Sequence, residues 1–70
     1  MTKEQITAAA EELARRNGWQ LHGVHDVVLI RADKADFSMR LSAGGGHKFR
    51  RTARAETANG VVVAKLPGEK

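Results

Sequence analysis

Cationic side chains are concentrated in one part of this 70-residue chain, and clustered cations are what neutralises the phosphates of a nucleic acid. Residues 1–35 carry five Lys/Arg and five Asp/Glu, whereas residues 36–70 carry seven and three, so the second half holds the whole net charge of +4. Five cations without an intervening acid lie between positions 40 and 54: Arg40, Lys48, Arg50, Arg51 and Arg54. This asymmetry predicts an anionic partner, either nucleic acid or an acidic protein surface.

The Asn-Gly pair at positions 59–60 predicts how most of these cations are arranged. Asn-Gly between two strand-like runs is the strongest short signal for a two-residue type I′ hairpin, here joining strands at about residues 47–58 and 61–66. The turn sets Ala58, Thr57, Ala55, Arg54 and Ala53 opposite Val61, Val62, Ala64, Lys65 and Leu66. One face then collects Lys48, Arg50, Thr52, Arg54 and Lys65. The other collects Phe49, Ala53, Ala55, Thr57, Val62, Ala64 and Leu66, with Arg51 as the exception. A one-residue slip would bury the charges, so the register is well specified.

Other chemistries find less support in the sequence. His22 and His25 have H-x-x-H spacing, but only His47 and the carboxylates remain as further ligands, so we expect no metal site. Three glycines at 44–46 lack the following helix and the Lys-Ser/Thr pair of a phosphate loop, and they indicate a flexible connection. No nucleophile–base or paired-carboxylate arrangement follows from spacing. We therefore expect binding rather than catalysis, with no cofactor.

The elements that position the cations begin with a helix at about residues 3–17. Thr2 and Gln5 have the spacing of a capping box, and Gly18 suits the left-handed residue that ends a helix. Apolar residues recur with helical spacing at Ile6, Ala9, Ala10, Leu13 and Ala14. This stripe predicts a helix with one face buried against a sheet.

Three further strands are predicted at about residues 19–22, 26–31 and 36–42. Residues 23–26 between the first two form either a turn or a bulge that bends one longer strand. The run at 27–30 is apolar on both sides and predicts a central strand with the helix over one face. Residues 36–42 alternate, with Arg40 facing water. The fold class is therefore α+β, a single domain over residues 1–70 with one N-terminal helix on an antiparallel sheet of four or five strands.

The composition predicts a thin core and an intracellular setting. Trp19, Phe37 and Phe49 are the only aromatic residues, and a homodimer or a covering partner would strengthen such a core. There is no cysteine, no apolar run of the signal-peptide kind at the N-terminus, and no apolar stretch longer than residues 27–30. We expect a cytoplasmic protein that does not enter a membrane.

Residues 6–42 resemble a known family. A helix ending in "RNGWQL", a turn "GVH" and two further strands are similar to the first part of HicA-type mRNA interferase toxins, whose fold is the α-β-β-β-α arrangement of double-stranded-RNA-binding domains. A Gly-Ser-His element carries the catalytic histidine in that family. Gly23 and His25 match it, Val24 replaces the serine, and a glycine run stands where the second helix should follow. The resemblance implies a ribonuclease with His25 as general acid/base, since imidazole titrates near neutral pH.

Three functions are thus open from the sequence. The leading one is a small, basic, non-catalytic protein that binds nucleic acid through Arg40, Lys48, Arg50, Arg51, Arg54 and Lys65. The same cations suit a small inhibitor or adaptor, of the kind that phage and bacterial mobile elements encode, which covers an acidic or nucleic-acid-binding surface of a larger protein. The third is the ribonuclease that the resemblance implies.

Overall fold

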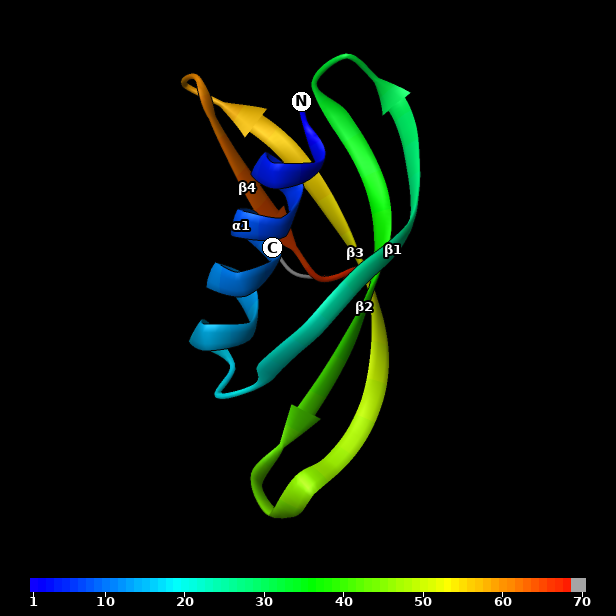
Figure 1. Ribbon diagram of the computed structural model, residues 1–70. Coiled ribbons are helices and arrows are strands. Elements are labelled where there is room, and N and C mark those ends of the chain that lie inside the picture. The colour runs from blue at the N-terminus through cyan, green and yellow to red at the C-terminus, as the bar shows by residue number, and fades with distance from the viewer. Residues whose placement is uncertain (69–70) are drawn as a thin grey trace.

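The structure is a computed structural model, which describes residues 1–68. Along the chain lie helix α1 (Lys3–Arg16) and strands β1 (Gln20–Arg31), β2 (Lys34–Ala43), β3 (His47–Ala58) and β4 (Val61–Lys65), with a short 3₁₀ turn at Gly44–Gly46. The strands form one antiparallel sheet in the order β1-β2-β3-β4. The helix covers one face of this sheet (Figure 1). The predicted α+β fold is confirmed, with four strands.

The helix begins and ends close to where the sequence predicts. Thr2 accepts a hydrogen bond from the amide of Gln5, and Gln5 Oε1 accepts one from the amide of Thr2 at 2.8 Å, which completes the capping box. Gly18 follows the helix with a φ of 74°, a value that favours glycine. The predicted helical stripe is buried in full: Ile6, Ala9, Ala10, Leu13 and Ala14.

The core lies between this stripe and one face of the sheet, which we call the helix face; the opposite side is the outer face. Alternate residues of β2 point into the core, as the predicted alternation requires. The sheet residues buried in the core are Ala35, Phe37, Met39, Leu41, Ala53, Ala55 and Ala64. Only the helix covers this sheet within the described residues, so the outer face is open to a ligand.

Strand β1 differs from the prediction in two ways. Residues 20–22 and 26–31 belong to one bent strand, whose register against β2 shifts near Asp26, a residue with a φ of 54°. Trp19, the first residue of the predicted strand at 19–22, lies outside it. The bulge alternative therefore holds. The prediction of a central strand at 27–30 is wrong, because β1 is the edge of the sheet. Leu21 and Val24 pack against the core before the bulge, whereas the apolar residues after it are exposed.

Smaller differences concern element ends. Strand β2 begins at Lys34, two residues earlier than predicted, because Arg31 pairs with Lys34 across a two-residue loop. Strand β4 ends at Lys65, one residue short of the prediction. Among the described residues there is no helix both long and apolar enough to cross a membrane.

Candidate nucleic-acid interface

The Asn-Gly hairpin has the predicted register. Asn59 and Gly60 have φ values of 52° and 78°, as a type I′ turn requires at both central positions. The pairs across it are Ala58–Val61, Thr57–Val62, Ala55–Ala64 and Arg54–Lys65. The expected Ala53–Leu66 pair falls outside β4. The sequence therefore predicted correctly which cations share a face.

Five of the six predicted binding residues lie on the outer face. Cross-strand pairing places Ser42 opposite Lys48, Arg40 opposite Arg50, and Asp36 opposite Arg54. Each of these four cations is exposed, as is Lys65 opposite Arg54 on β4. The cations thus extend over three strands, and Arg40 on β2 joins them through the β2–β3 pairing rather than through the predicted hairpin.

Arg51 is the residue that the fold separates from the others. It lies opposite the buried Met39 and therefore on the helix face. Its guanidinium carbon lies 6.0 Å from the Trp19 ring centre and 5.7 Å from that of Phe49, and the two rings pack edge to face at 5.1 Å. A cation over aromatic rings is attracted by their quadrupoles, which explains an arginine on an otherwise apolar face. Its position separates it from the other predicted binding residues.

One half of the outer face is charge-compensated. Arg54 Nε donates to Asp36 Oδ1 at 2.8 Å, and Lys34 Nζ lies 3.8 Å from Glu56 Oε1. The hydrogen bond from Arg54 holds the pKa of the Asp36 carboxyl below its ordinary value and raises the pKa of Arg54. Lys65 lies beside this pair. An anionic ligand would have to compete here with carboxylates that are already in place.

The other half carries uncompensated positive charge. Arg40, Lys48 and Arg50, which we call the basic cluster, form no ion pair within residues 1–68. Arg40 and Arg50 are direct cross-strand neighbours. Like charges in that position destabilise a sheet, so the fold gains nothing from this pair.

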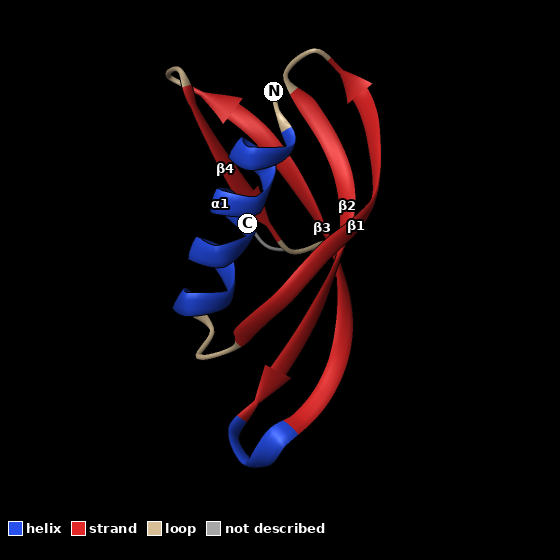
Figure 2. Ribbon diagram, viewed as in Figure 1, coloured by secondary structure: helices blue, strands red, loops and turns tan. Residues whose placement is uncertain are grey.

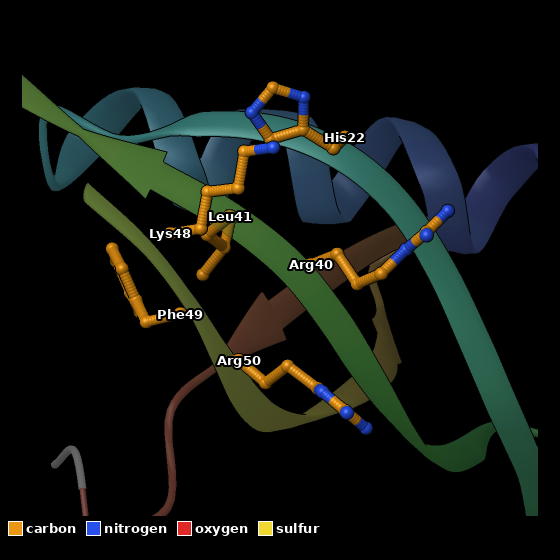
Figure 3. Close-up of a pocket in the computed structure, with 6 residues that line it drawn as sticks. All are labelled: His22, Arg40, Leu41, Lys48, Phe49 and Arg50. Atoms are coloured by element: carbon orange, nitrogen blue, oxygen red, sulfur yellow. The ribbon is translucent and has the colours of Figure 1, made fainter. Parts of the chain in front are cut away.

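A hollow lies at the basic cluster (Figure 3). It is lined by His22, Arg40, Leu41, Lys48, Phe49 and Arg50. The His22 ring is held over β2 by a 2.8 Å hydrogen bond between its Nε2 and Ser42 Oγ. Lys48 reaches from β3 toward His22, while Arg40 and Arg50 extend away from that pair. The cations therefore spread along the surface, as contacts to a chain of phosphates require.

Gly23 gives Arg40 the space for its side chain. A Cβ atom at Gly23 would lie 2.9 Å from Nη2 of Arg40, closer than real Cβ atoms come to other atoms. Gly23 is also the β1 residue opposite Arg40 in the register. The guanidinium therefore lies across the backbone of β1 where a side chain is missing. A side chain at position 23 would therefore have to displace the Arg40 guanidinium from this position.

The three glycines form the tip of an arm. Figure 2 shows the 3₁₀ turn at the end of a β2–β3 hairpin that extends past the C-terminal end of α1. A Cβ at Gly44, Gly45 or Gly46 would meet no atom within 4 Å, so the tip is slender and open. A strand rather than a helix follows the glycines, which removes the geometry of a phosphate loop. The basic cluster lies on the arm just behind this tip.

His25 occupies a different environment. Its Nδ1 lies 2.9 Å from Asp26 Oδ2, and its Nε2 is covered from solvent without a hydrogen-bond partner. An imidazole that acts on RNA needs a nitrogen that reaches the substrate, so catalysis by His25 would require the structure to open around Nε2. The ribonuclease interpretation stays a prediction from the sequence. The described part of the chain contains no group of His, Cys, Asp and Glu side chains suited to a metal ion.

Two contributors to the site were not anticipated. The spacing of His22 and His25 drew attention to His22 only as a metal ligand, although its contact with Ser42 places it in the hollow. Asp36 was predicted only as the first residue of a strand, yet it is the carboxylate that neutralises Arg54. Both contacts depend on the pairing of β2 with its neighbours. Comparisons with protein-family models, curated proteins and solved structures find no match to this chain.

Proposed function

We propose that this protein binds nucleic acid through the basic cluster on the outer face of β2 and β3. The observation that carries the proposal is the direct opposition of Arg40 and Arg50 on neighbouring strands, with no acidic partner among the described residues. Phosphates supply the compensation that the fold lacks, and each phosphate contact releases condensed counterions. The compensated Arg54 has a secondary part in the site.

The arm favours a duplex over a single strand. A two-stranded antiparallel ribbon fits the major groove of B-DNA, and the glycine tip has no side chain to obstruct entry. Single-strand platforms stack bases on exposed aromatic rings, whereas Trp19 and Phe49 are packed together beneath Arg51 on the helix face. Contacts from Arg and Lys to phosphates position a protein on a duplex but do not read the base sequence of the nucleic acid. The proposed binding is therefore to duplex phosphates, with little sequence preference.

The experiment compares two arginines on the same strand and face. Arg50 and Arg54 lie four residues apart on β3, one uncompensated and one paired with Asp36. The binding of fluorescent DNA duplexes, RNA duplexes and single strands is measured by anisotropy between 50 and 200 mM salt. We expect duplex binding that weakens with salt, and a larger loss of affinity for Arg50→Gln than for Arg54→Gln.

Two outcomes would contradict the proposal. Equal effects of the two substitutions would show that overall charge, not the cluster, governs binding. If none of the tested nucleic acids bound in a salt-dependent way, the proposal would be wrong. The same cations would then favour the inhibitor or adaptor alternative, in which they contact an acidic protein surface. Because both variants lose one positive charge, the comparison is matched.

A further inference from the structure

An exposed apolar run lies on the edge strand β1. Its four consecutive side chains are exposed by 39% at Val27, 60% at Val28, 62% at Leu29 and 45% at Ile30. None of them is among the buried residues of the hydrophobic core or the partly buried side chains that pack against it. The run contains no Lys or Pro, the residues that commonly protect an edge strand from pairing.

The run exposes apolar surface on both faces of the sheet. Val28 lies opposite Asp36 on the outer face, whereas Leu29 lies opposite the buried Ala35 on the helix face. A ligand lying on one face would cover only one of these two side chains. A strand placed alongside β1 would shield both and would also pair the outward main-chain groups of the edge.

The charges at the two ends of the run indicate which strand would pair with β1. Asp26 precedes the run and Arg31 follows it. In an antiparallel pair of two identical runs, the acidic end of each lies beside the basic end of the other. We propose that a second copy of this chain pairs with β1 antiparallel through residues 27–30, which forms a two-fold dimer with a continuous eight-stranded sheet.

A two-fold arrangement also closes the assembly. Pairing of β1 with β1 uses the same patch on both copies and leaves no further edge of that kind, whereas pairing β1 with β4 of the next copy would continue without end. The two-fold axis of an antiparallel pair stands perpendicular to the sheet, so both outer faces lie on the same side. The dimer would thus present two basic clusters to one ligand, although the pairing itself does not depend on nucleic-acid binding.

The test uses two equally exposed valines on the two edge strands. Val28 on β1 and Val61 on β4 are both 60% exposed, so a lysine at either position leaves the core intact. The mass of the protein in solution is measured by light scattering and analytical ultracentrifugation at protein concentrations of about 1–200 μM. This range covers a dimer whose dissociation constant is roughly micromolar. We expect a dimer for the parent and for Val61→Lys, and at least tenfold weaker association for Val28→Lys. Circular dichroism checks that both variants fold.

A charge reversal tests the antiparallel orientation separately. Arg31→Glu places an acid beside Asp26 of the other copy at both ends of the paired runs, so it should weaken the dimer. The double variant Arg31→Glu with Asp26→Lys has opposite charges there again and should restore it. A monomeric parent protein over the whole range would overturn the proposal, as would equal loss of the dimer in the Val61→Lys variant. A monomeric Val28→Lys variant that still binds duplex would show that the dimer can be lost while nucleic-acid binding is kept, so the two proposals can fail independently.

Discussion

Arg40 and Arg50 lie directly opposite each other on β2 and β3, with their side chains on the same exposed face. Directly opposed like charges destabilise an antiparallel pair of strands. The nearby Arg54 shows the usual solution, since the register brings Asp36 opposite it at 2.8 Å. Arg50 and Arg54 therefore differ on the same strand, because Arg50 faces another arginine while Arg54 faces a carboxylate.

The first prediction is that Arg50→Gln weakens binding without weakening the fold. Removal of one of two opposed charges should leave the free energy of unfolding unchanged or raise it by a few tenths of a kcal/mol. The affinity for duplex should fall, because a phosphate contact is lost. Chemical denaturation and anisotropy on the same sample check both effects. A clear loss of stability would mean that Arg50 has a structural partner and would remove the reason for assigning it to a ligand.

The second prediction concerns the carboxylate that compensates Arg54. Asp36→Asn should free Arg54 for phosphates, so duplex binding should tighten and its dependence on salt should become steeper. Arg54→Gln is the matched control, because it breaks the same pair and removes the cation. Tighter binding by both variants, or by neither, would contradict the role given to this pair.

The same pair predicts a pH dependence of stability. Arg54 lowers the pKa of Asp36 from its ordinary 3.8, so the folded state binds this proton less readily than the unfolded chain does. The contribution is therefore fully present above pH 3.8 and is lost as the pH falls through the folded-state pKa. Melting temperatures of the parent and Asp36→Asn should differ slightly at pH 7 and converge in acid. A difference that grew in acid would have the wrong sign.

The third prediction concerns the turn that fixes the β3–β4 register. Gly60 has a φ of 78°, which a β-branched side chain tolerates poorly, so Gly60→Val should destabilise the fold by about 1 kcal/mol or more. Gly44→Ala is the control, since Gly44 does not have positive φ and a Cβ there meets no atom within 4 Å. An unchanged melting temperature for Gly60→Val would contradict the type I′ turn.

The fourth prediction concerns catalysis. We expect the purified protein not to cleave RNA, because His25 Nε2 is covered and has no partner through which a proton could pass. Incubation with labelled RNA tests this. Cleavage that disappears in a folded His25→Ala variant would establish the ribonuclease interpretation, whereas cleavage that persists would indicate contamination or another site.

Most of the fold could be predicted from local sequence signals. Helix α1 was predictable because Thr2, Gln5 and Gly18 act on nearby residues, and the β3–β4 register followed from Asn59 and Gly60 alone. The same register correctly separated Arg51 from the cations of the outer face. Each of these signals acts over only a few residues of sequence.

The errors concern the order and pairing of strands. A short apolar run does not by itself distinguish a central strand from an edge strand, so residues 27–30 were misplaced. The Arg40–Arg50 opposition depends on how Gly44–Gly46 turns the chain, and three glycines carry no signature of one turn geometry. Asp36 and Arg54 are 18 positions apart, and only the sheet brings them together.

The most direct test of nucleic-acid binding by the basic cluster compares two double variants of equal net charge. Lys48→Gln with Arg50→Gln removes two cations of the cluster, while Lys3→Gln with Arg15→Gln removes two exposed cations of α1. The measurement is the slope of log K against log salt for a DNA duplex. We predict that the first variant flattens this slope by about 0.9 per lost phosphate contact and that the second leaves it nearly unchanged. Equal slopes for the two variants would contradict the account, because binding would then follow net charge rather than the cluster.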